Sequence, residues 1–186
     1  MKKIVLVALA AFGVFSLTSC EAIEGIINQI GGEKDYNYDD FRALLADRKL
    51  VFDATKCSCS IDTDGTKTSK EYTYDTGDKI WKYTYEDTIV GVSITRTEER
   101  DLDVVNLTKS CGTTAALLNK TVDSLFKFYA TSDAYRIVAT YKDSSEQVEE
   151  EYKFRSDGLL TYCHKKETNL SSVTTVEETS TFSYSK

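Results

Sequence analysis

The chain has 186 residues, a formal net charge of −7 at pH 7 and no proline. Its 23 lysines and arginines are scattered rather than clustered, which argues against binding to nucleic acid or to an anionic membrane surface. Hydrophobic residues make up 41% of the sequence, enough for a folded core, so wholesale disorder is excluded.

The first residues have the pattern of an export signal. Lys2 and Lys3 precede a mainly apolar run from Ile4 to Leu17, which is the charged-then-hydrophobic order of a secretory signal. This run is too short for a transmembrane helix, because about 20 apolar residues are needed to cross the hydrocarbon core. We therefore expect residues 1–19 to be a signal peptide that is removed on export.

The segment Leu17-Thr18-Ser19-Cys20 resembles the lipobox of bacterial lipoproteins, in which an aliphatic residue and two small residues precede a cysteine. The resemblance implies that the Cys20 thiol receives a diacylglycerol, that fatty acids such as palmitate anchor the protein, and that cleavage occurs just before this residue. The mature chain would keep 167 residues, with 21 basic and 30 acidic side chains and a net charge of −9. We expect the lipid anchor to bind the cell-envelope membrane, at the outer membrane or cell surface rather than the inner membrane.

Four further cysteines follow Cys20 in the chain, namely Cys57, Cys59, Cys111 and Cys163. An exported protein meets an oxidising compartment, where an even number of cysteines favours two disulfide bonds. Cys57 and Cys59 lie two apart on an expected strand, so each would more easily reach Cys111 or Cys163 than the other. The alternative is a metal site formed by Cys57, Cys59, Cys163 and His164. Zinc sites usually contain two closely spaced pairs of Cys or His ligands, however, and this chain has a single Cys-x-Cys pair. We predict no metal and no cofactor.

The first half of the mature chain is predicted to hold a tether and one folded unit. Residues 20–38 are expected to carry the lipid anchor and a spacer, and residues 39–110 one helix and four strands. Asp39 and Asp40 are expected to cap a helix with an apolar face of Phe41, Leu44 and Leu45. The strands are expected at about 50–61, 69–75, 80–85 and 90–101, with turns at Asp64-Gly65 and Gly77-Asp78.

The second half, residues 111–186, is predicted to repeat this order. Apolar residues recur at three- and four-residue steps between Thr113 and Tyr129, which predicts a helix. Four strands are expected at about 134–142, 147–155, 159–167 and 172–185, with a turn at Asp157-Gly158. Glu71-Tyr72-Thr73-Tyr74 also stands 80 positions before Glu151-Tyr152-Lys153-Phe154, which suggests a duplication; chance similarity of hairpins is the alternative.

These elements predict an α+β fold of two similar units, each one helix and a four-stranded antiparallel meander, which could pool into one eight-stranded sheet. The order of these elements resembles that of the tandem helix-plus-four-strand modules of beta-lactamase inhibitor proteins. The resemblance is in element order alone, so it implies no binding residues in this chain. A curled sheet similar to the periplasmic carriers of lipoproteins is an alternative, and a lipocalin-like closed barrel is another.

The main candidates for a binding face are five aromatic residues, namely Tyr72, Tyr74, Trp81, Tyr83 and Tyr85. Their alternation predicts that those of each strand share one face of the sheet. That face could be a core that packs beneath a helix. It could also be a partly solvated surface, because a tyrosine hydroxyl in a dry core needs a hydrogen-bond partner, and rigid aromatic rings suit the recognition of proteins or sugars.

No catalytic constellation stands out in the sequence. His164 is the only histidine, so any histidine-dependent acid–base chemistry would have to use it. Asp62-Thr63-Asp64-Gly65 lacks the third ligand of a calcium-binding loop and predicts a turn. We predict a non-catalytic binding module for a protein, peptide or glycan. A carrier of a lipid or apolar ligand is the alternative, and an envelope hydrolase is the second alternative.

Overall fold

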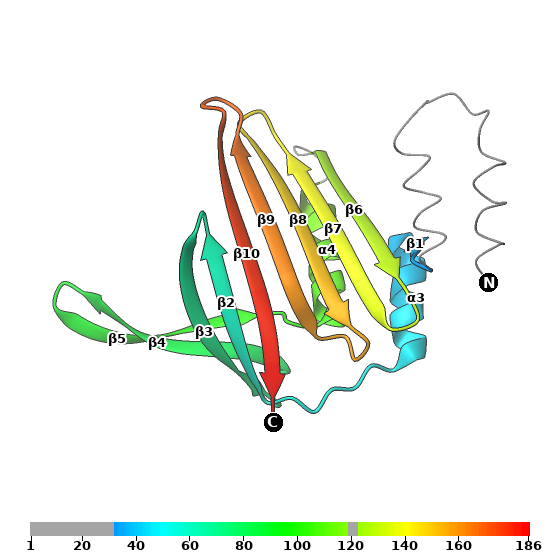
Figure 1. The fold of residues 1–186 in the computed structure, drawn as a ribbon, viewed down its shortest axis with the longest axis horizontal. Coiled ribbons are helices and arrows are strands. Elements are labelled where there is room, and N and C mark those ends of the chain that lie inside the picture. Colours follow the sequence, from blue (N-terminus) through cyan, green and yellow to red (C-terminus); the bar gives the residue numbers. More distant parts are fainter. Residues whose placement is uncertain (1–31, 119–122) are drawn as a thin grey trace, which may run out of the picture. The chain divides into compact units, whose positions relative to one another are not determined.

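The computed structural model describes residues 32–118 and 123–186 (Figure 1). The chain separates into two units, Met1–Glu33 and Lys34–Lys186, and the described helices and strands belong to the second. The predicted signal peptide, Cys20 and most of the predicted tether lie outside the described residues. Within the described ranges, no helix has the length and apolar character to cross a membrane.

The described residues of the second unit form two helices and ten strands. Its first part contains β1 (Lys34–Tyr36), α3 (Tyr38–Arg48), β2 (Lys56–Thr63), β3 (Thr66–Asp75), β4 (Ile80–Ile89) and β5 (Val92–Arg100). Its second part contains α4 (Val104–Leu118), β6 (Asp123–Ala130), β7 (Ala134–Lys142), β8 (Glu146–Arg155), β9 (Leu160–Asn169) and β10 (Thr174–Ser185). The four strands expected between residues 134 and 185 are confirmed, and those expected between 50 and 101 are confirmed with shifted ends.

All ten strands form one antiparallel sheet in the order β1-β6-β7-β8-β9-β10-β2-β3-β4-β5 (Figure 1). The α+β class and the curled sheet are therefore confirmed. The expected count of eight strands is wrong, because β1 and β6 were not foreseen. The described part of the sheet has β1 and β5 as separate edges, so the lipocalin-like closed barrel is wrong. The organisation into two similar units stays a prediction.

Helix α3 confirms the helix expected after the tether but begins differently. The side chain of Asn37, not Asp39 or Asp40, caps it by accepting a hydrogen bond of 2.9 Å from the backbone N–H of Asp40. The two aspartates lie in the first turn, where negative charge interacts favourably with the helix dipole. The first strand expected after this helix starts later than predicted, because residues 50–55 form no strand.

The helix expected from Thr113 to Tyr129 is the main error in the predicted elements. Helix α4 begins at Val104, capped by Asp103, whose carboxylate accepts a 2.9 Å hydrogen bond from the backbone N–H of Asn106. The second half of the expected helix is strand β6, in which Phe128 is buried and the neighbouring Lys127 is exposed. Its apolar residues fit both a helical and an alternating spacing, and pairing with β7 decides in favour of the strand.

The core lies between the helices and one face of the sheet. On α3, Phe41 is fully buried, with its ring centroid 5.1 Å from that of Phe128. Trp81 of β4 is also fully buried. Just after β5, the carbonyl of Leu102 accepts a 2.9 Å hydrogen bond from the N–H of Leu160, which joins the end of β5 to the start of β9. The base of the β4–β5 hairpin is therefore fixed to the core.

Candidate functional site

The five aromatic residues predicted as a binding face come together on one face of β3 and β4, but they differ sharply in exposure. Tyr72 is 1% exposed and Trp81 is fully buried, so both belong to the core. The rings of Tyr74 and Trp81 lie 5.1 Å apart by their centroids, and Phe52 packs against both. Tyr72, Tyr74 and Trp81 are thus structural, whereas Tyr83 and Tyr85 lead outward along β4.

Tyr83 and Tyr85 belong to a segment that we name the hairpin arm, Tyr83–Glu98, which comprises most of β4 and β5. Strand β3 pairs only with Ile80, Trp81 and Lys82 of β4, so the hairpin beyond these residues has no other strand beside it among the described residues. Figure 1 shows the two strands extending away from the rest of the sheet. A two-stranded ribbon of this kind is only marginally stable in water on its own.

One face of the hairpin arm is apolar. Cross-strand pairing places Arg96 opposite Tyr85 and Ile94 opposite Asp87, so these side chains share the face that continues into the core. The rings of Tyr83 and Tyr85 are stacked with centroids 5.4 Å apart, and Arg96 Nε lies 2.9 Å from Asp87 Oδ2. Arg96 and Asp87 therefore form an ion pair on this face, and the third charged side chain of the face, Glu98, lies at the base of the arm.

The exposed hydrophobic side chains of the arm are more exposed the nearer they lie to its tip. The exposed fraction is 37% for Tyr85, 41% for Ile94, 61% for Val92 and 97% for Val90 in the turn. The opposite face is polar, with Thr84 and Thr97 hydroxyls 3.3 Å apart. The hairpin arm is thus amphipathic, and beyond the half-buried Tyr83 its apolar face has no cover within the described residues.

A half-buried polar network fixes the base of the arm. The Tyr72 hydroxyl donates a 2.8 Å hydrogen bond to Glu98 Oε1, and Lys70 Nζ lies 2.5 Å from Glu98 Oε2. Burial alone would raise the pKa of Glu98, but these two partners outweigh it and hold that pKa below its usual value. The guanidinium of Arg100 lies 5.3 Å from the ring centroid of Phe182 on β10. These contacts set the direction in which the arm leaves the sheet.

The four cysteines Cys57, Cys59, Cys111 and Cys163 are all free and buried, which corrects the prediction of two disulfides. Cys163 on β9 cannot reach β2, because β10 lies between these strands and two strand spacings amount to about 10 Å, beyond the Cα separation that a disulfide spans. Burial raises the pKa of Cys57 to about 11, and those of Cys111 and Cys163 to about 12. Protonated thiols of this kind are poor nucleophiles.

The remaining sequence candidates serve the fold. His164 Nδ1 lies 3.1 Å from the Thr179 hydroxyl on the neighbouring strand. In the Asp64-Gly65 turn, the carboxylate of Asp62 accepts a 2.9 Å hydrogen bond from the N–H of Gly65, as expected of a turn. Among the residues that the structure describes, no group of three or more His, Cys, Asp or Glu side chains could hold a metal ion.

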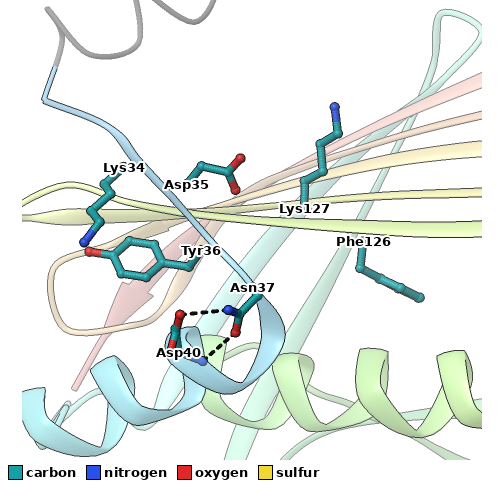
Figure 2. A pocket seen from close by; sticks show the side chains of 7 residues that line it. All are labelled: Lys34, Asp35, Tyr36, Asn37, Asp40, Phe126 and Lys127. Carbon is teal, nitrogen blue, oxygen red and sulfur yellow. Dashed lines mark hydrogen bonds between the residues drawn. The ribbon is translucent and has the colours of Figure 1, made fainter.

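A cavity of about 750 Å³ lies between β1, the start of α3 and β6 (Figure 2). Asn37 Nδ2 donates a 2.8 Å hydrogen bond to Asp40 Oδ2 there, so both side chains are engaged in capping α3. Figure 2 shows Lys127 pointing away from this pair, while Lys34 Nζ lies over the ring of Tyr36, 4.9 Å from its centroid. The polar groups do not converge on one point, so the hairpin arm is the stronger candidate.

Part of the site was missed by sequence reasoning. Val92, Ile94 and Arg96 complete the apolar face beside the tyrosines, but β5 was predicted only as a strand. The alternation of these residues from Val92 to Arg96 was the available signal. Comparison with protein-family models, with curated proteins and with solved structures gives no match.

Proposed function

We propose that this protein is a lipid-anchored component of the bacterial cell envelope, and that it acts as a non-catalytic binding module for another protein. The export signal pattern and the lipobox ending at Cys20 support the location. The hairpin arm supports the activity and would be the part that contacts the partner.

The observation that carries the proposal is the uncovered apolar face of the hairpin arm. Aliphatic side chains that are 41% to 97% exposed gather at its outer end, at Ile94, Val92 and Val90. Exposed apolar patches on folded proteins mark interaction sites, and stacked tyrosines are common at protein interfaces. This aliphatic content favours a protein over a glycan, because sugars are recognised mainly through aromatic rings and hydrogen bonds.

The same structure makes the other candidate functions less favoured. In a carrier, the ligand would lie between the helices and the sheet, where Phe41, Trp81 and Leu102 are fully buried side chains. A hydrolase would need an activated nucleophile, but burial raises the pKa of the Cys163 thiol, and the side-chain hydrogen bond of His164 within the described residues is with the Thr179 hydroxyl.

Site-specific photo-crosslinking in cells that make the full chain tests the proposal. A photoreactive residue at position 94 places the probe on the apolar face of β5, and one at position 95 places it on the polar face of the same strand. We expect a discrete adduct with a different protein from position 94 and at least tenfold less from position 95. Equal yields at the two positions, or no heterologous adduct at 94, would refute the assignment.

A further inference from the structure

The outer edge of the hairpin arm is an open strand edge. Among the strands that the structure describes, β5 is the last of the sheet and pairs only with β4. No backbone hydrogen bond found outside the strand ladders involves residues 92–100 among the described residues. Such an edge presents a row of backbone donors and acceptors that another strand can pair with.

The charges along β5 restrict which strand can pair there. Within Val92–Arg100, basic Arg96 stands two residues before acidic Glu98, and both lie on the apolar face of the arm. When two copies of β5 pair antiparallel with their two-fold axis at Thr97, each Arg96 lies opposite the Glu98 of the other copy. Opposite charges in directly facing positions stabilise a strand pair.

Neighbouring registers lack this match. Centring the axis on Arg96 or on Glu98 would place two like charges directly opposite each other, which destabilises a strand pair. Shifting the register by one residue would place the apolar face of one arm against the polar face of the other. The edge of β4 offers no equivalent, because Tyr83–Ile89 carries Glu86 and Asp87 but no basic residue.

The side chains of Arg96 and Glu98 can each form a further hydrogen bond. Arg96 uses Nε towards Asp87, which leaves the other guanidinium N–H groups, and its side chain is 46% exposed. Glu98 accepts one hydrogen bond at each oxygen, from Tyr72 and Lys70, and each oxygen has a further lone pair. Both side chains lie on the face that the two copies would share; in the single copy their partners are on β4 and β3, and pairing would add a side chain of the second copy as a further partner.

We propose that two copies of this chain associate through antiparallel pairing of their β5 edges, with Thr97 of each copy at the two-fold axis. The pairing places four strands side by side, β4 and β5 of one copy and β5 and β4 of the other. It also joins the two apolar arm faces into one continuous surface. This inference goes beyond the proposed function and does not require it to be correct.

Cysteine crosslinking of the full chain in its own membrane tests the register. At the two-fold axis, the Cα atoms of the two Thr97 residues would lie about 4.5–5.5 Å apart, within reach of a disulfide. We expect Thr97→Cys to give a covalent dimer on a non-reducing gel after mild oxidation. The matched control is Thr84→Cys, because Thr84 lies directly across from Thr97 on β4 and shares its polar face. The two copies of Thr84 would lie three strand spacings apart, about 14 Å, too far to crosslink.

Charge reversal tests the partner contacts. With Thr97→Cys present, Arg96→Glu alone and Glu98→Arg alone each place two like-charge pairs at the interface, so we expect roughly tenfold less dimer. Co-expression of these two variants with different tags should restore a mixed dimer, because every facing pair is then opposite in charge. Restoration also shows that both variants fold. Equal dimer yields from Thr97→Cys and Thr84→Cys, or no mixed dimer, would overturn the inference.

Discussion

Replacing Tyr72 with phenylalanine tests the polar network that holds the hairpin arm. The substitution removes only the hydroxyl of a side chain that is 1% exposed, and with it the 2.8 Å hydrogen bond to Glu98. A hydrogen bond to a charged group contributes about 1.5–3 kcal/mol to stability, and water reaching the partly exposed Glu98 reduces this loss. We therefore expect the free energy of unfolding to fall by about 1–2 kcal/mol at pH 7.

The same substitution has a predicted pH dependence. The folded-state pKa of Glu98 lies below its usual 4.5, so its stabilising contribution is present above that value and is lost as the pH falls through the lowered pKa. Tyr72→Phe removes one of the hydrogen-bond partners that lower this pKa, while Lys70 and Arg100 remain. The stability difference between the natural protein and the variant should thus be largest near neutral pH and should narrow below about pH 4.

Urea unfolding of the two proteins between pH 7 and pH 3 measures both effects. Tyr83→Phe is the matched control, because its ring lies 5.8 Å from that of Tyr72 and the substitution removes the same hydroxyl group from a side chain that is only half-buried. This control should change the stability by less than about 0.5 kcal/mol. A loss below about 0.3 kcal/mol for Tyr72→Phe at pH 7, or a loss that is the same at pH 3, would refute the reasoning.

The remaining predictions concern the backbone, the thiols, the anchor and the tip of the arm. Gly158→Ala should cost about 1–3 kcal/mol in urea unfolding, because Gly158 has a φ of +88° and a Cβ there would lie 2.8 Å from Leu50 Cδ1. The four thiols after Cys20 should resist a water-soluble thiol reagent at pH 8 in the folded protein, since they are buried and burial raises their pKa. All four should react once the protein is unfolded without reductant, and fewer than four reactive thiols would indicate a disulfide. Cys20→Ser should abolish incorporation of a labelled fatty acid, and a retained label would contradict the anchor. Val90→Asn should raise the free energy of unfolding by roughly 0.5–1 kcal/mol, because asparagine tolerates a positive φ better than valine, and it should weaken photo-crosslinking to the partner protein. A variant that is no more stable than the natural protein would contradict the proposed backbone strain at Val90.

The strands from β7 to β10 were predictable because two local signals agree there. Each strand shows alternation, as in β7, where Tyr135, Ile137 and Ala139 are buried in turn, and the Asp157-Gly158 turn separates β8 from β9. Strand β1 has only three residues, Lys34–Tyr36, which is too short for any period to show. In β6 the apolar spacing fits two periods, and only the long-range pairing with β7 selects one.

The candidate site was predictable in its residues but not in its exposure. Alternation correctly placed Trp81, Tyr83 and Tyr85 on one face of β4. Their exposure depends on how far β3 continues beside β4, and that pairing stops at Lys82. The end of a strand pairing is set by tertiary packing rather than by local sequence, so the step from the buried Trp81 to the exposed Tyr85 could not be read from the chain.

The turns of two long hairpins add a physical reason to expect contacts outside the unit. Val90 ends the β4–β5 hairpin at a φ of 52°, and Val173 lies in the β9–β10 turn at 54°, a region that costs a β-branched residue about 1–2 kcal/mol. Both side chains are exposed, by 97% and 82%, so no burial within the described residues offsets that strain. Covering a valine side chain contributes roughly 1.5–3 kcal/mol, an amount that matches or outweighs the strain. The tip of the hairpin arm therefore gains stability only when something outside the unit covers it, which is what a binding arm requires.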